Sequence, residues 1–154
     1  MLTAEMKHEI EAEAAIHAQP RGACIEAMKV VQRHYGWVDD EALAEIAALL
    51  GMTPVEVDSV ATFYNLIRRR PVGRHVILIC TSVSCWITGY GALLSQLQAS
   101  LGIGLGQTTA DGRFTLIPNQ CLGACDHAPA LMIDDDLHRD LTPEQLDAVL
   151  AQYA

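Results

Sequence analysis

The chain has 154 residues, of which 51% are apolar and 19% are charged, a composition that argues against a disordered protein. This length suffices for one domain with a buried core, or for a compact domain with an appendage. Its net charge of -9 argues against nucleic acid or an anionic membrane surface as a partner. No apolar stretch is long enough to cross a bilayer, and the acidic N-terminus lacks the apolar segment of a signal peptide. We therefore expect an intracellular protein without direct membrane insertion.

Residues 1–70 predict a helical bundle as the N-terminal domain. Apolar residues recur at helical spacing on one face of each of the first three helices: Leu2, Met6, Ile10 and Ala14, then Ile25, Met28, Val31 and Tyr35, then Leu43, Ile46, Ala47 and Leu50. Caps and breakers mark the helix ends: Thr3, Pro20, Gly36, Asp39 or Asp40, Gly51, and the capping box Thr53-Pro54-Val55-Glu56 that opens a fourth helix. We expect the aromatic pair Phe63 and Tyr64 to anchor the core between the two halves of the chain.

Residues 71–154 predict a second domain built on a β-sheet. The apolar, β-branched run 75–80 is typical of a strand that is covered on both faces. Residues from about 87 to 101 predict a helix, and a second strand follows at 113–117, between the turn Asp111-Gly112 and Pro118. A strand, a helix and a strand in this order predict a parallel pair of strands.

The rest of this domain predicts an antiparallel hairpin and a final helix. The runs 130–133 and 137–141 flank the acidic turn Asp134-Asp135-Asp136, and the helix opens with the capping box Thr142-Pro143-Glu144-Gln145. The order βαβ and then ββα predicts an α/β (α+β) fold: a thioredoxin-like four-stranded mixed sheet that follows the helical bundle.

Four of the five cysteines form two close pairs, Cys80 with Cys85 and Cys121 with Cys125. Each pair follows a predicted strand, so we expect each to lie where a strand gives way to a loop. Two parallel neighbours deliver such loops to the same edge of the sheet, which brings the four thiols together as a ligand set for a metal centre. The fifth cysteine, Cys24, lies on an apolar helix and is expected to be a buried, inert thiol.

Three chemistries compete for these thiols. A thioredoxin-type dithiol enzyme needs two residues between its cysteines, and neither pair has this spacing. The spacing alone permits either a structural zinc site, as in a zinc-stapled interaction module, or a [2Fe-2S] cluster. The surrounding sequence favours the cluster: the sheet domain needs no staple, and Gly123 and Ala124 let backbone amides approach an anionic group. The hydroxyl groups of Ser82 and Ser84 are further candidate donors, whereas the neighbouring His127 is expected to act as a donor rather than a ligand.

Four segments of the chain resemble the E subunits of NADH-quinone oxidoreductases, the thioredoxin-like [2Fe-2S] subunits of respiratory complex I: Ala61-Thr62-Phe63-Tyr64, Pro71-Val72-Gly73-Arg74-His75-Val76, Cys80-Thr81-Ser82-Val83-Ser84-Cys85 and Cys121-Leu122-Gly123-Ala124-Cys125. The resemblance runs nearly from end to end. It implies that the four paired cysteines bind one [2Fe-2S] cluster, and we predict that each pair holds one iron.

The resemblance also implies the setting of the protein. The partner would be the flavoprotein subunit of the F type, which carries FMN and NADH, within the peripheral arm of complex I at the cytoplasmic side of the bacterial inner membrane. The chain would be part of an oxidoreductase but have no catalytic side chains of its own; its Gly102-Ile103-Gly104 segment is no dinucleotide fingerprint. The alternative within the same family is the equivalent subunit of an NAD-linked hydrogenase or formate dehydrogenase.

Overall fold

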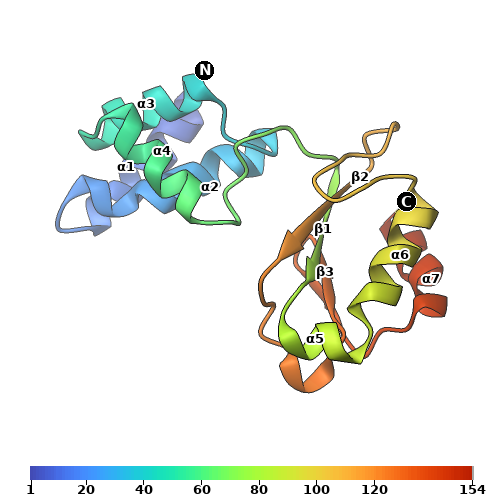
Figure 1. The fold of residues 1–154 in the computed structure, drawn as a ribbon. Helices are drawn as coiled ribbons and strands as arrows, with labels where there is room; N and C mark the ends of the chain where they lie inside the picture. The colour runs from blue at the N-terminus through green and yellow to red at the C-terminus, as the bar shows by residue number, and fades with distance from the viewer. Residues whose placement is uncertain (154) are drawn as a thin grey trace. The chain divides into compact units, whose positions relative to one another are not determined.

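The computed structural model of the chain describes residues 1–153 and divides into two compact units, Met1–Pro71 and Val72–Ala154. Each unit has its own hydrophobic core. The first unit is all helical, with α1 (Ala4–Ile16), the 3₁₀ turn η1 (Pro20–Ala23), α2 (Cys24–Tyr35), α3 (Asp40–Leu50) and α4 (Pro54–Phe63). Figure 1 shows these helices in order along the blue and green part of the chain.

The helix ends of the first unit follow the capping signals in the sequence. The side chains of Thr3 and Asp39 accept hydrogen bonds from the first turns of α1 and α3, and Thr53 forms the predicted capping box of α4 with Glu56. The left-handed glycine caps end α2 and α3 as predicted. The helical bundle predicted from the sequence is thus confirmed.

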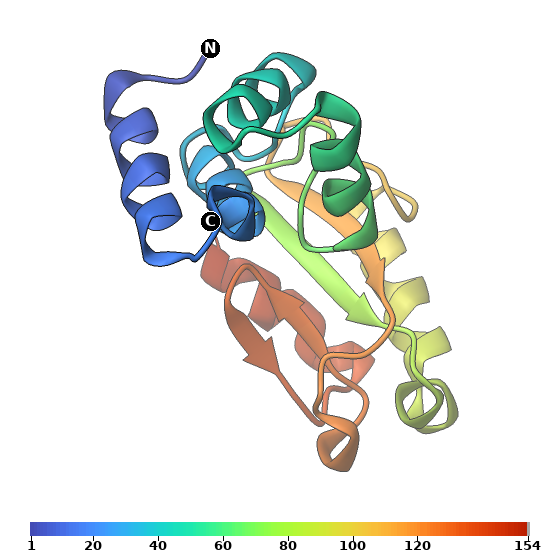
Figure 2. The same ribbon diagram turned by 90° about the vertical axis from the view of Figure 1, so that its left-hand side faces the viewer.

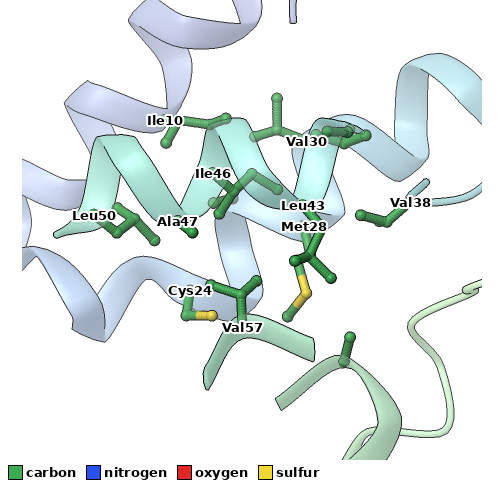
Figure 3. Packing of buried hydrophobic residues seen from close by; sticks show 14 of the residues in the cluster. Ile10, Cys24, Met28, Val30, Val38, Leu43, Ile46, Ala47, Leu50 and Val57 are labelled. Atoms are coloured by element: carbon green, nitrogen blue, oxygen red, sulfur yellow. The ribbon is translucent and has the colours of Figure 1, made fainter. Parts of the chain in front are cut away.

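Side chains of α2, α3 and α4 meet in the core of this bundle, as Figure 3 shows for Met28, Ile46 and Val57. Cys24 lies in the same core, and burial raises the pKa of its thiol. Tyr35 does not belong to this core, contrary to the prediction. It is the last residue of α2, its side chain is 48% exposed, and its hydroxyl donates to the carbonyl oxygen of Met1 at 3.2 Å.

The prediction that Phe63 and Tyr64 are core residues is wrong. The buried residues of α4 are Val57 and Ala61, four positions apart on one face of the helix. Phe63 is two positions further on, so it projects from another face and is 80% exposed. Tyr64 is 45% exposed and meets the ring of Phe63 edge to face at 5.2 Å between centroids. The two rings therefore pack on each other at the surface.

The second unit contains one mixed sheet of four strands, β1 (His75–Cys80), β2 (Phe114–Asn119), β3 (Leu131–Ile133) and β4 (Asp136–His138). The strands lie in the order β2-β1-β3-β4; β1 is parallel to β2 and antiparallel to β3, and β3 is antiparallel to β4. Figure 2 shows β1 in light green between β2 in orange and the red hairpin. The predicted thioredoxin-like mixed sheet is confirmed.

Two strands differ from their predicted limits. β2 continues through Pro118 to Asn119 rather than ending before the proline, because β2 is an edge strand where a missing N–H costs no ladder bond. The hairpin turn is shorter than predicted: Ile133 pairs with Asp136, so only two residues form the turn. Asp134 adopts a positive φ of 54°, which such a tight turn requires. β4 accordingly begins at Asp136 and ends at His138.

The helix predicted over residues 87–101 is two helices, α5 (Val83–Thr88) and α6 (Tyr90–Leu101). Gly89 separates them with a φ of 131°, a conformation that L-residues rarely adopt. The last predicted helix consists of α7 (Leu146–Leu150) between the 3₁₀ turns Pro143–Gln145 and Ala151–Tyr153. Figure 1 shows α6 and α7 together on one face of the sheet, where Leu97 and Leu146 pack against Ile77 and its neighbours.

The parallel pairing of β1 and β2 positions the functional segments. Cys80, the last residue of β1, is in register with Asn119, the last residue of β2. α5 follows β1, and the short 3₁₀ turn η2 (Cys125–His127) follows β2, so both lie at the same end of the sheet (Figures 1 and 2). Within residues 1–153 no single helix has both the length and the apolar composition to span a membrane; α3 and α4 pass only as a pair, and they are bent by 114°.

Candidate metal centre

Three elements carry the four paired cysteines. Cys80 ends β1, Cys85 lies in the first turn of α5, and Cys121 and Cys125 flank the turn after β2, with Cys125 opening η2. The sequence predicted that each pair lies where a strand gives way to a loop; Cys80 does end a strand, but Cys85 lies in a helix. Its carbonyl oxygen accepts a hydrogen bond from the N–H of Gly89 that closes α5.

The first pair of thiols is buried. Cys80 and Cys85 are 3% and 1% exposed and pack in a small apolar cluster with Ala124 and Ala130. Because Ala124 lies between the two cysteines of the second pair, this cluster joins the two ligand segments. Burial, followed by the neighbouring Cys80 thiol, raises the pKa of Cys85 to about 11. At neutral pH a thiol with this pKa stays protonated unless a positive partner stabilises the thiolate.

The second pair is exposed, and its sulfur atoms lie 3.8 Å apart. Gly123 has a positive φ of 76°, and its N–H donates to Cys121 Sγ at 3.3 Å. This hydrogen bond, and then the contact with Cys125, lowers the pKa of Cys121. The hydrogen bond between the Cys125 thiol and Cys121, and then the repulsion between their charges, raises the pKa of Cys125. The N–H of Gly123 therefore offsets negative charge on the sulfur of Cys121.

Contacts between the two segments bring all four thiols together. Cys121 interacts with the thiol of Cys80 and the hydroxyl of Ser82, and the hydroxyl of Ser84 interacts with Cys125. Both serine hydroxyls lower the pKa of the thiol that they contact, as donors to sulfur do, although the largest influences on these pKa values are those given above. The two turns that the sequence predicted to converge therefore do converge.

Asn119 and Thr81 support these turns, a role that the sequence pattern does not predict. Asn119 is 6% exposed, and its side-chain amide donates to the carbonyl oxygen of Cys121 at 3.0 Å. Its own carbonyl oxygen accepts from the N–H and the hydroxyl of Thr81, at 2.8 Å and 3.1 Å. Asn119 therefore joins the residue after Cys80 to the backbone of Cys121. A polar residue at the end of a strand is too common a feature to have predicted this role.

The thiols are arranged as two pairs. Two thiolates bound at about 2.3 Å to one tetrahedral metal ion lie roughly 3.8 Å apart, and Cys121 and Cys125 have this separation. Among residues 1–153, no group of three or more Cys, His, Asp and Glu side chains is arranged to hold a metal ion. The donor set fits a group that takes two thiolates at each of two irons, with N–H and hydroxyl donors around it.

Residues 10–154 match the thioredoxin-like [2Fe-2S] ferredoxin family. The chain belongs to this family. Its curated relatives include the E subunits of NADH-quinone oxidoreductase from Pseudomonas aeruginosa, 50% identical over 99% of this chain and 92% of the relative, and from Escherichia coli K12, also 50% identical over 99% and 92%. One of the E subunits of this enzyme from Rhizobium meliloti, numbered 2, is 42% identical over 96% of this chain and 88% of the relative.

Solved structures of the same fold include an NAD⁺-reducing [NiFe]-hydrogenase in its air-oxidised state. The likeness has a TM-score of 0.73 at 28% identity and covers 85% of this ferredoxin-family chain. It corresponds to only 22% of the hydrogenase chain, so the rest of that chain has no counterpart here. The likeness to relatives over almost their full length is therefore the more informative of the two.

Proposed function

We propose that the chain is the [2Fe-2S] electron-transfer subunit of an NADH-quinone oxidoreductase, with Cys80, Cys85, Cys121 and Cys125 as the cluster ligands. The observation that carries the proposal is the meeting of the four thiols in two pairs at one end of the sheet, with 3.8 Å between the sulfur atoms of the second pair. The 50% identity to the E subunits of NADH-quinone oxidoreductases along 99% of the chain supports the complex in which it serves.

A [2Fe-2S] cluster supplies one-electron redox chemistry when bound. The chain's own residues bind and tune it. The buried thiols of Cys80 and Cys85 would hold the cluster away from water, and the exposed thiols of Cys121 and Cys125 would lie toward a redox partner. The N–H of Gly123 and the hydroxyls of Ser82 and Ser84 offset negative charge on sulfur. Acid–base and nucleophilic groups have no part in this function.

We further propose that the redox partner is the FMN- and NADH-binding flavoprotein subunit of the F type. The outer face of α5 supports a protein contact beside the thiols: Val83, Trp86 and Ile87 share helical spacing and are 68%, 67% and 70% exposed. Tryptophan is among the residues that most often anchor a protein interface. The complex would be peripheral to the cytoplasmic side of the inner membrane.

The division of the chain into domains 1–70 and 71–154 is also a proposal, and the two compact units Met1–Pro71 and Val72–Ala154 support it. The equivalent subunit of an NAD-linked hydrogenase is the second candidate function, on the likeness with a TM-score of 0.73. Its 28% identity, against 50% for the oxidoreductase subunits, makes it the weaker candidate.

Replacement of single cysteines tests the ligand assignment. We expect Cys80→Ser, Cys85→Ser, Cys121→Ser and Cys125→Ser each to lose most of the bound iron and sulfide, whereas Cys24→Ser retains the full amount. A cluster that persists in any two of the four variants, or that is lost with Cys24, contradicts the assignment.

Affinity purification of the complex from its native host tests the partner. We expect the wild-type chain to co-purify with a flavoprotein, and Trp86→Glu to lose that flavoprotein while it keeps its own iron and sulfide. Recovery of a hydrogenase large subunit instead favours the second candidate. An unchanged association of Trp86→Glu contradicts the role of α5.

A further inference from the structure

We propose that Asp140 is a positioning residue for the cluster: through His127 it fixes the turn η2 that carries Cys125. The inference rests on the proposed function, since it assumes that Cys125 is a ligand. It adds a residue that lies 15 positions after the last cysteine and makes no contact with sulfur within the described chain.

Asp140 directly precedes a residue of the hydrophobic core. The next residue, Leu141, is 7% exposed and belongs to the core of the sheet domain, and its N–H donates to the carbonyl oxygen of Pro129 at 3.2 Å. Asp140 itself has a φ of 51°, in the left-handed region where aspartate is among the few residues other than glycine that are tolerated. A glycine would adopt this conformation with less strain but would have no carboxylate. The strained backbone therefore indicates that the side chain has a use at this position.

Asp140 makes two hydrogen bonds with His127, one through its side chain and one through its backbone. The carboxylate Oδ2 accepts a hydrogen bond from His127 Nδ1 at 2.8 Å, and the N–H of Asp140 donates to the carbonyl oxygen of His127 at 3.0 Å. His127 ends η2, and its N–H donates to the carbonyl oxygen of Ala124. The side chain and the carbonyl group of His127 are thus held by Asp140, which precedes the core residue Leu141, and its N–H is held by the turn that contains Cys125.

The pair is too exposed to matter much for overall stability. The side chains of His127 and Asp140 are 46% and 64% exposed, and exposed ion pairs contribute only about 0–1 kcal/mol. Its effect is local, because it restrains three residues around a ligand. Supporting contacts of this kind next to a metal site typically change metal affinity by about 10- to 100-fold when they are removed.

The chain offers a matched control at the other end of the sheet. Asp134 has a φ of 54°, its carboxylate accepts from His75 Nδ1 at 2.7 Å, and its N–H donates to the carbonyl oxygen of Val76 at 3.0 Å. The contact is similar to that of Asp140, although its backbone hydrogen bond goes to the residue after the histidine. His75 begins β1 whereas Cys80 ends it, about 16 Å away at roughly 3.3 Å per residue. The carboxylate of Asp134 also accepts from the N–H of Val76, so its loss costs at least as much stability.

The test uses the full chain with its cluster and two readouts, the rate of cluster loss to an iron chelator and the electron paramagnetic spectrum of the reduced protein. We expect Asp140→Ala and His127→Leu to lose the cluster about 10-fold faster than wild type and to change the g values. We expect His127→Asn, whose side-chain amide replaces the Nδ1 donor, and Asp140→Asn, which keeps an acceptor, to remain close to wild type. Asp134→Ala should match wild type in both readouts.

Each outcome decides a separate point. Cluster loss and spectra of Asp140→Ala that equal those of Asp134→Ala overturn the positioning role while the ligand assignment stands. If Asp140→Ala yields no soluble protein, His127→Leu is compared with His127→Asn instead. Equal cluster loss and equal spectra in these two variants overturn the positioning role. A wild-type chain that holds no cluster overturns the proposed function, and the inference with it.

Discussion

Replacement of Gly123 by alanine separates the conformational role of this residue from its role as a donor to sulfur. Gly123 has a φ of 76°, and no heavy atom of the described chain lies within 4 Å of an added Cβ. The cost of the change is therefore the left-handed backbone alone, about 1–2 kcal/mol. Gly106 has a φ of 77° and is equally open around an added Cβ within the described residues, which makes Gly106→Ala a matched control.

The two variants should unfold alike but differ in redox behaviour. In the iron-free chain we expect each to lower the melting temperature by about 4–8 °C per kcal/mol of strain, the scale for a unit of this size. The N–H of Gly123 donates to Cys121 Sγ, whereas that of Gly106 donates to the carbonyl oxygen of Leu116. A shifted N–H stabilises the more negative reduced cluster less well, so the reduction potential of Gly123→Ala should fall and that of Gly106→Ala should not.

Calorimetry and an electron paramagnetic redox titration measure these two quantities. Equal reduction potentials in the two variants would refute the role of the Gly123 amide. A clear decrease of the melting temperature in one variant and no decrease in the other would refute the assumption that each substitution costs only backbone strain.

Three further predictions concern two buried residues and one ion-pair network. Leu97→Ala removes a side chain that is fully buried against the sheet and should lower the free energy of unfolding by about 2–5 kcal/mol. Urea denaturation of the iron-free chain measures this change. A decrease below about 1 kcal/mol, the range of surface substitutions, would contradict the place of Leu97 in the core. Arg69→Ala removes hydrogen bonds to Asp40 and Asp58 and should cost about 1 kcal/mol, because both carboxylates are largely exposed. The exposed Arg70→Ala should be near neutral, and equal effects of the two variants would argue against these contacts. Burial raises the pKa of Cys24, so at a given pH below that value less of this thiol is ionised in the folded chain than in the unfolded chain. Iodoacetamide should therefore label Cys24 more slowly in the folded protein than in urea. Equal labelling rates would contradict its burial.

Much of the fold was predictable because its signals are local. Thr3, Asp39 and Thr53 cap their helices through bonds within a single turn, and such bonds depend only on neighbouring residues. The break at Gly89 was missed because a glycine inside an apolar helical pattern does not reveal its φ. Phe63 was misplaced because an aromatic residue next to a buried helix face is expected inside, and only its position two residues after Ala61 turns it outward.

The site was predictable as far as topology alone determines it. Parallel strands that end together bring Cys80 and the 121–125 turn to one edge, and the sequence pattern is enough to predict those strands. The contacts of Asn119 with Cys121 and of His127 with Asp140 depend on the paths of irregular loops. His127 and Asp140 are 13 residues apart, and no periodic signal joins them. The supports of the ligand turns therefore emerge only from the structure.

The metal content of the purified protein tests the central claim most directly. When the full chain is isolated without oxygen, we expect two irons and two inorganic sulfides per chain, as the [2Fe-2S] family implies, and an electron paramagnetic signal of a single unpaired electron after reduction. A colourless protein that contains one zinc ion and no sulfide would contradict it.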